Sequence, residues 1–240
     1  MKALLIDTSE GVSPWTECGV LAEWFGPLLA SVAHLDIGAA AASDPACGGR
    51  ALAADAVVVT GSARDADSQE PAVLRLMETL QTLAERDVPV FGVCFGHQIL
   101  ARAMGGTVGR NPSGWEVGNV RISLTAAGLT CPLLNDLGAD PMVLQSHQHA
   151  VLDLPPGGVL LAGNAHTAVQ AFQSCPGGRQ FGVQFHPEFT PERLRKNWIE
   201  RREQLQGSTS FDLDAALDEA QPTPHTAMLL RRFFDFAAAS

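Results

Sequence analysis

A strand, a helix and a second strand in the first half of the chain restrict its fold more than any other feature. Residues 56–59 (Ala-Val-Val-Val) form a short β-branched run that is typical of a buried central strand, and the run stops at Thr60-Gly61-Ser62. Pro71 suits the first position of a helix, and apolar residues then recur every three or four positions to about Arg86. A second apolar run, residues 88–93, follows directly. Two such strands joined through a helix predict parallel neighbours, and therefore an α/β fold.

The rest of the chain continues with short strands and helices and becomes richer in hairpins in its second half. We expect further strands at residues 3–6, 115–125, 142–146, 159–162, 168–172 and 180–185, and helices at 15–29, 95–104, 192–206, 212–220 and 225–238. Residues 38–54 are rich in Ala and Gly and only weakly patterned. The helical spacing of Met228, Leu229, Phe233 and Phe236 predicts that the last helix packs on the domain.

Charge and cysteine content exclude several classes of function. The 240 residues include 16 Lys and Arg against 26 Asp and Glu, a formal net charge of −10, whereas binding to nucleic acid or to an anionic membrane requires clustered basic residues. The five cysteines include no CxxC pair, so neither a disulfide framework nor a zinc finger is expected. No segment approaches the roughly 18 apolar residues of a membrane span, and the N-terminus does not resemble a signal peptide. We therefore expect a cytoplasmic protein with no nucleic-acid or membrane partner.

Residues 90–98 (VFGVCFGHQ) place a cysteine between a buried strand and a helix. The sulfur of a cysteine at such a turn projects from the edge of the sheet, and the positive end of the following helix favours the thiolate, the form that attacks a carbonyl carbon. Gly92 and Gly96 relieve crowding around the turn, as in the nucleophile elbow of serine hydrolases. Cys94 is therefore a candidate nucleophile, although buried cysteines at strand ends more often serve packing.

Residues 181–189 (FGVQFHPEF) end another strand at a histidine, because Pro187 cannot continue the hydrogen-bonded ladder. The Glu188 carboxylate is close enough in sequence to hold the His186 imidazole in one tautomer. The other ring nitrogen is then free to take a proton from a thiol. With Cys94 these residues would complete a Cys/His/Glu relay, and the alternative is an ordinary strand end with a solvated histidine and glutamate.

Together, GVCFGHQ and GVQFHPE resemble the nucleophile and His-Pro-Glu motifs of class I (triad) glutamine amidotransferase domains. They occur in the family's order, 92 positions apart (186 − 94), and the resemblance covers roughly residues 1–200. Gly114-Trp115-Glu116 and Ser146-His147-Gln148 are also similar to segments of stand-alone members such as the γ-glutamyl peptidases. We therefore expect a flavodoxin-like, three-layer α/β sandwich with a central, mostly parallel sheet and an antiparallel extension. It would be a single domain, residues 1–240, with a helical extension at 201–240.

The resemblance also implies a reaction and a role for each site residue. Cys94 is expected to attack the γ-amide carbonyl of glutamine or of a γ-glutamyl compound, with His186 as general base and acid and Glu188 as its orienting carboxylate. Hydrolysis of the resulting thioester releases glutamate after ammonia or an amine has left. The backbone N–H groups of Gly61 and Phe95 would form the oxyanion hole. Substrate contacts are implied for Gln98, Ser146, His147 and Gln148, and no metal or organic cofactor is required.

Two positions depart from the family pattern. The family usually has a pair of glycines where this chain has Gly61-Ser62, but the serine side chain does not prevent the Gly61 N–H from donating. His149 stands where relatives usually have an aspartate near the glutamyl group, and Glu116 is a candidate to replace that carboxylate. His147 and His149 could instead form a metal-binding pair on one strand face, although no third ligand is identifiable.

Two alternative functions are also compatible with the sequence. The chain could be a glutaminase subunit that supplies ammonia to a separate synthetase, since it has no phosphate-cradling GxxxxGKS or GxxxxGKT loop for ATP. It could also be a catalytically silent module that binds a glutamyl metabolite or regulates a partner. The presence of Cys94, His186 and Glu188 together favours an active enzyme.

Overall fold

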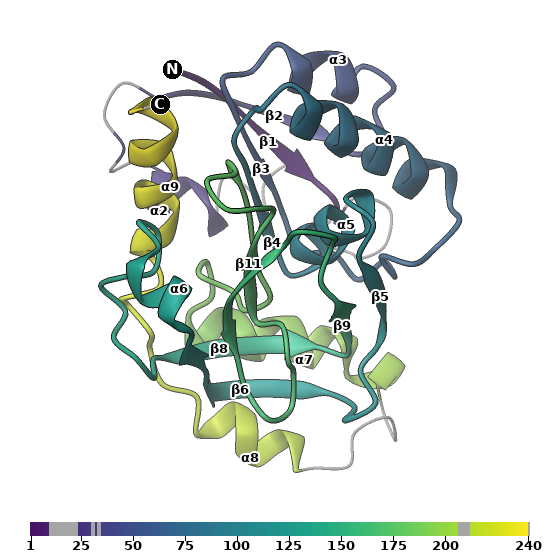
Figure 1. Ribbon diagram of the computed structural model, residues 1–240. Helices are drawn as coiled ribbons and strands as arrows, with labels where there is room; N and C mark the ends of the chain where they lie inside the picture. Colours follow the sequence, from purple (N-terminus) through teal and green to yellow (C-terminus); the bar gives the residue numbers. More distant parts are fainter. Residues whose placement is uncertain (10–23, 30–31, 33–34, 206–211, 240) are drawn as a thin grey trace.

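The computed structural model describes residues 1–9, 24–29, 32, 35–205 and 212–239, and an eight-stranded sheet lies at its centre (Figure 1). The strand order is β2-β1-β3-β4-β12-β11-β10-β7. The first five strands are parallel, and each of the last three is antiparallel to its neighbour. Their bounds are β1 (Lys2–Asp7), β2 (Asp36–Ala41), β3 (Ala56–Val59), β4 (Val90–Val93), β7 (Ser123–Leu124), β10 (Val159–Gly163), β11 (Ala171–Gln173) and β12 (Gln180–Val183). The predicted mostly parallel sheet with an antiparallel extension is confirmed.

Helices cover both faces of this sheet, so the predicted three layers are present (Figure 1). Side chains of the strands alternate between the layers. In β3, Val57 and Val59 belong to the core beneath α4 (Pro71–Glu85) and α5 (Phe95–Ala103), and Val58 belongs to the core beneath α9 (Met228–Ala238). On the α9 side, Phe233 packs on Phe91 of β4 with ring centroids 5.5 Å apart. The helices are α2 (Gly26–Leu29), α3 (Cys47–Leu52), α4 (Pro71–Glu85), α5 (Phe95–Ala103), α6 (Ala126–Thr130), α7 (Pro191–Leu205), α8 (Leu213–Asp218) and α9 (Met228–Ala238).

Two small antiparallel sheets lie beside the large one. β5 (Thr107–Arg110) pairs with β9 (His149–Asp153), and β6 (Glu116–Arg121) pairs with β8 (Met142–His147). The chain passes from β8 to β9 through Gln148 alone. His147 and His149 therefore belong to different strands and different sheets.

The carboxyl ends of three neighbouring parallel strands bring the candidate site residues to one edge. Val59 of β3 pairs with Gly92 of β4, and Val183 of β12 pairs with Val93. If the β3–β4 pairing is extended by two residues, Gly61 lies beside Cys94. If the β12–β4 pairing is extended by one residue, Gln184 lies on the other side of Cys94. Open α/β sheets bind their ligands at this edge.

The sequence-based element predictions are confirmed in most places and wrong in a few. The interval 38–54, which carries little pattern, contains most of β2 and all of α3. The strand predicted at 115–125 is divided into β6 and β7, which join different sheets. Of the helix predicted at 15–29, only its end falls within the described residues, as α2, and Trp15 lies outside them. In α9 the predicted contacts of Leu229 and Phe233 are present, but Met228 is 44% exposed.

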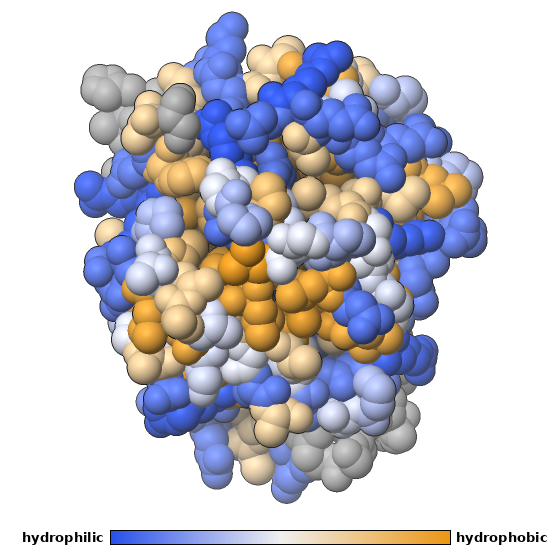
Figure 2. Space-filling model, viewed as in Figure 1, coloured by the Kyte–Doolittle hydropathy of each residue, from blue (hydrophilic) through white to orange (hydrophobic). Residues whose placement is uncertain are grey.

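Hydrophilic side chains surround an apolar area near the middle of the face drawn in Figure 2. None of the helices in the described part of the chain combines the length and the apolar character needed to cross a membrane. Cys47 and Cys131 are buried free thiols, Cys175 is exposed, and Cys18 lies outside the described residues.

Candidate active site

Cys94 lies on a strained turn between β4 and α5. Its backbone has φ 51° and ψ −104°, a left-handed value that a non-glycine residue rarely adopts. A Cβ on Gly92 would overlap the backbone of Gly96, and a Cβ on Gly96 would overlap the carbonyl of Val59. Both glycines are thus required for the helix to cross so close to the strands, and the strain is concentrated at the candidate nucleophile.

Gly61, Cys94 and His186 meet at one point. A Cβ built on Gly61 would lie 3.1 Å from Cε1 of His186 and 3.6 Å from Cβ of Cys94. Cys94 and His186 are 94% and 95% buried, and the Cys94 sulfur contributes to the raised pKa of the His186 imidazole. The two motifs, 92 positions apart in the sequence, are therefore joined in space.

His186 and Glu188 form a short hydrogen-bonded pair, because His186 Nδ1 lies 2.7 Å from Glu188 Oε1. Burial by itself would lower the pKa of His186, but the Glu188 carboxylate and the Cys94 sulfur outweigh it and raise the pKa to about 10. Among the described residues, Nε2 of His186 has no hydrogen-bond partner, so this nitrogen is available on the Cys94 side. The ring stacks on Phe189 with centroids 3.9 Å apart, and Arg193 Nη1 donates to the Glu188 carbonyl at 2.7 Å.

Two backbone N–H groups beside Cys94 are candidates for the predicted oxyanion hole. Within the described part of the chain, neither the Gly61 N–H nor the Phe95 N–H donates a hydrogen bond. The Gly61 turn is held in place from β1: Thr8 Oγ1 donates to the Gly61 carbonyl at 2.9 Å, and Ser62 Oγ donates to the Thr8 carbonyl at 2.7 Å. The serine that departs from the family pattern therefore fixes the turn and leaves the Gly61 N–H free.

Two buried glutamines connect the nucleophile to the start of β9. Gln98 Nε2 donates to the His149 carbonyl at 2.7 Å and to Gln184 Oε1 at 3.0 Å. Gln184 Nε2 in turn donates to Cys94 Sγ at 3.6 Å. Gln98, expected to contact substrate, thus has its amide nitrogen committed to protein acceptors.

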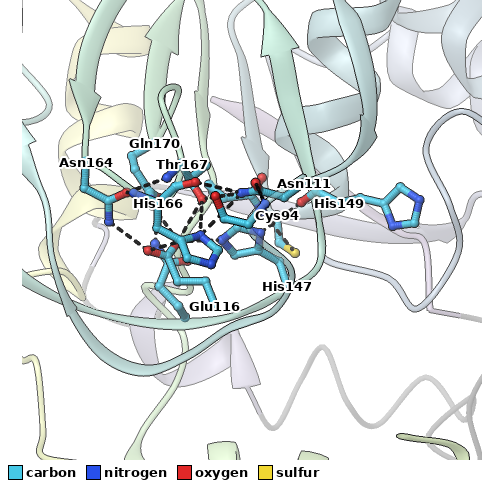
Figure 3. Close-up of polar contacts among 12 residues, drawn as sticks. Cys94, Asn111, Glu116, His147, His149, Asn164, His166, Thr167 and Gln170 are labelled. Carbon is cyan, nitrogen blue, oxygen red and sulfur yellow. Dashed lines mark hydrogen bonds and ion pairs between the residues drawn. The ribbon is translucent and has the colours of Figure 1, made fainter. Parts of the chain in front are cut away.

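Glu116 is the centre of a buried polar network (Figure 3). Burial would raise its pKa, but His147 Nε2 at 2.9 Å and the amides of Asn164 and Gln170, each at 2.7 Å, overcome this and lower the pKa to about 2. Thr167 Oγ1 donates to the same carboxylate at 3.1 Å. With every described contact made to protein donors, Glu116 is a structural carboxylate, not a free group for a substrate amine.

His147 and His149 point to different surroundings, which rules out a shared metal site for the pair. His147 Nδ1 lies 2.9 Å from the His149 carbonyl and Nε2 faces Glu116, so both nitrogens are occupied. The His149 ring is directed away from the Glu116 network in Figure 3, and it lies 3.4 Å from a carboxylate oxygen of Asp65 and 3.8 Å from one of Asp67.

The structure brings six of the nine predicted site residues together, and the other three make contacts with protein groups of their own. Around the sulfur lie Gly61, Cys94, Phe95, Gln98, His186 and Glu188. Ser146 is 93% buried and its Oγ accepts a hydrogen bond from Trp198 Nε1 at 2.9 Å, and His147 belongs to the Glu116 network. Gln148 is half-buried, and its carbonyl accepts from Asn111 N at 2.8 Å. Sequence reasoning missed Gln184, whose only signal is a polar residue inside an apolar strand end.

His97 follows the nucleophile closely in sequence but lies outside this group. It is fully buried, 5.1 Å from the ring of Phe172 between centroids, and burial lowers its pKa to about 3. It is therefore neutral at neutral pH and fills space between α5 and the sheet.

Comparisons with known proteins agree with this geometry. Residues 38–204 match the sequence model of the glutamine amidotransferase class-I family. "Gamma-glutamyl peptidase 3" of Arabidopsis thaliana is 35% identical over 145 residues, which are 58% of this chain and 57% of that protein. A glutamine-hydrolyzing GMP synthase of Parafrankia is 41% identical over 101 residues, 42% of this chain and 18% of the synthase. The match thus spans a little more than half of the length of the peptidase and less than a fifth of the length of the synthase.

Solved structures show the same fold. A glutamine amidotransferase from Thermotoga maritima superposes with a TM-score of 0.75 over 99% of this chain and 98% of that one, at 18% identity. One from Methylobacillus flagellatus gives a TM-score of 0.74 over 99% and 94%, at 22% identity.

Proposed function

Because the chain belongs to the class I glutamine amidotransferase family, we propose that it is a hydrolase of the γ-amide of glutamine or of γ-glutamyl compounds. Cys94 is the nucleophile, His186 the general base and acid, and Glu188 the carboxylate that orients His186. The observation that carries the proposal is the meeting of Cys94, His186 and Gly61 at one sheet edge. γ-Glutamyl peptidases among the relatives support this substrate class.

In the first half-reaction the Cys94 thiolate attacks the γ-carbonyl carbon and a C–S bond forms. The carbonyl oxygen becomes an oxyanion, for which the free N–H groups of Gly61 and Phe95 are placed as donors; each such donor is worth roughly 3 to 4 kcal/mol. His186, protonated because its pKa is raised to about 10, gives its proton to the leaving nitrogen. The C–N bond breaks, and ammonia or an amine leaves a γ-glutamyl thioester.

In the second half-reaction water attacks the thioester. His186, now neutral, takes a proton from the water as the new C–O bond forms, and the C–S bond then breaks to release glutamate and the thiolate. Glu188 remains an acceptor for His186 Nδ1–H throughout, which keeps Nε2 directed at the reacting atoms.

Glutamate release from glutamine and from a γ-glutamyl dipeptide, measured side by side with Cys94→Ala as the blank, tests the proposal. Faster Cys94-dependent turnover of the dipeptide would establish a stand-alone γ-glutamyl hydrolase. No turnover of either compound by the isolated chain would contradict the proposal.

A second candidate is a glutaminase subunit that feeds ammonia to a separate synthetase. The observation that favours it is the 41% identity to part of a glutamine-hydrolyzing GMP synthase. Turnover of glutamine but not of the dipeptide would favour this candidate. A catalytically silent binding module would turn over neither compound yet still bind them.

A further inference from the structure

We propose that Gln184 is a further catalytic residue, whose side-chain amide holds the Cys94 sulfur as a thiolate by donating a hydrogen bond to it. The inference rests on the proposed role of Cys94 as the nucleophile. Gln184 is fully buried, its Nε2 lies 3.6 Å from Cys94 Sγ, and it follows β12 directly, beside Cys94 in the register of the sheet.

The direction of this hydrogen bond is fixed by a neighbouring glutamine. The His149 carbonyl can only accept, so the Gln98 atom that lies 2.7 Å from it must be the amide nitrogen. That nitrogen also lies 3.0 Å from the terminal atom of Gln184, which must therefore be the amide oxygen. The remaining terminal atom of Gln184, the one facing the sulfur, is then the nitrogen.

The His149 carbonyl is itself held from the opposite side. His147 Nδ1 lies 2.9 Å from it, and His147 is fixed by Glu116 through Nε2. A series of fixed hydrogen bonds thus runs from the buried carboxylate of Glu116 to the nucleophile. Gln98 acts through Gln184 and is a positioning residue.

A hydrogen-bond donor beside the Cys94 sulfur influences where the thiol proton goes. An amide N–H stabilises the charged sulfur but cannot accept its hydrogen, so the proton of the thiol goes to the His186 imidazole, which interacts with the same sulfur. An amide also keeps its hydrogens at every accessible pH. Gln184 therefore favours the thiolate without competing with His186 for the proton.

Alkylation of Cys94 by iodoacetamide, followed as a function of pH and located on the Cys94 peptide by mass spectrometry, tests the proposal without any substrate. In Gln184→Leu we expect alkylation to slow by about tenfold at pH values below the midpoint of the wild-type profile, since one hydrogen bond to a charged atom is removed. The pH of half-maximal rate should rise by about one unit. Gln184→Glu keeps the volume but turns an acceptor toward the sulfur, so it should slow the reaction at least as much.

Gln180→Leu is the matched control. Gln180 is also a buried glutamine with two partners, Ser174 Oγ at 2.8 Å and the Val88 carbonyl at 3.0 Å, but it lies at the opposite end of β12 from Gln184. It should lose similar stability and alkylate as the wild type does. Gln98→Leu, which frees the Gln184 amide to turn, should slow alkylation by about threefold.

Folded Gln184→Leu or Gln184→Glu protein that alkylates at the wild-type rate across the pH range would overturn the proposal. Iodoacetamide reacts with the thiol and requires no substrate. Wild-type alkylation rates in both Gln184 variants would therefore contradict the role of Gln184 and say nothing about the proposed function. An enzyme that fails to hydrolyse glutamine and the dipeptide, but shows the predicted alkylation shift, would contradict the function and retain the role of Gln184.

Discussion

Cys94 and His186 can lie close together at the site because Gly61, beside them, has no side chain. The Gly61 turn is fixed by Thr8 and Ser62, so it has little freedom to withdraw from His186. A methyl group there would come within 3.1 Å of the His186 ring, closer than nine in ten Cβ contacts in proteins. Either the imidazole or the turn must then move, and both carry part of the proposed chemistry.

We predict that Gly61→Ala lowers kcat by about 100-fold, because loss of one oxyanion-hole donor or misplacement of the base has an effect of this size. Stability should change little, since the clash involves one ring edge. Steady-state kinetics and thermal unfolding measure both quantities. Gly109→Ala, at a buried glycine whose Cβ would meet only a Leu152 methyl at 3.4 Å, is the control and should retain full activity. An active Gly61→Ala enzyme would contradict the geometry of the turn.

At the scale of elements, the crossing of α5 over β3 and β4 sets the site. Gly96 N donates to the Thr60 carbonyl at 3.1 Å, and the helix lies against the strand backbone with no side chain between them. The crossing determines where Cys94 can lie and how close the oxyanion turn comes. It is held by backbone contacts, which cannot be relieved by a change of rotamer.

Gly96→Ala should therefore lower the free energy of unfolding by about 3 kcal/mol and abolish activity, since its Cβ would overlap the Val59 carbonyl. Urea unfolding checks the first effect. Gly49→Ala, within α3 where an added Cβ meets nothing within 4 Å, should be neutral or slightly stabilising. If Gly96→Ala and Gly49→Ala changed the free energy of unfolding equally, the close crossing of α5 over β3 would not be what Gly96 is required for.

Local pattern was sufficient for elements that carry strong apolar periodicity, and it failed where pairing partners decide the structure. Residues 56–59 and 90–93 are apolar on both faces, and their strands follow from composition. β2 contains Gly38 and a run of alanines with little strand propensity, and it forms because β1 offers a parallel partner in register. The break at Gln148 arises because β8 and β9 pair with different strands.

The candidate site was predictable to the extent that it lies in two short motifs. Cys94, His186 and Glu188 stand within recognisable strings, and their residue types suggest the chemistry. The roles of Glu116 and Gln184 depend on partners 31 to 90 positions away in the chain, such as Gln98 and Asn164, and no local pattern specifies such contacts. For the same reason the sequence allowed His149 to pair with His147 at a metal, whereas in the structure His147 faces Glu116 and His149 faces Asp65 and Asp67.

At the scale of the whole molecule, the Glu116 network ties the small sheets to the large one. Its donors come from β8 and from the segment between β10 and β11, and the Glu116 side chain is only 4% exposed. The carboxylate is charged in the folded protein, because its pKa is lowered to about 2 from an ordinary 4.5. A depressed pKa means that the charged form stabilises the fold.

This stabilisation is present above pH 4.5 and is lost as the pH falls through 2, so it declines across that window. We expect Glu116→Gln to lower the free energy of unfolding at pH 7 by about 3 kcal/mol. The difference from the wild type should shrink steadily below pH 4.5. Urea unfolding between pH 2.5 and 7 measures it, with the exposed Glu85→Gln as a control expected to be neutral. A gap between wild type and Glu116→Gln that is constant with pH would contradict the assignment.

The most direct test of the account is covalent capture of the nucleophile. The chain is incubated with a chloroketone analogue of glutamine, and the modified residue is located by peptide mass spectrometry. We predict a single adduct on Cys94, absent from Cys94→Ala and formed much more slowly in His186→Ala. Hydrolysis of glutamine or of a γ-glutamyl dipeptide by protein that gains no adduct on Cys94, or that gains one elsewhere, would contradict the account.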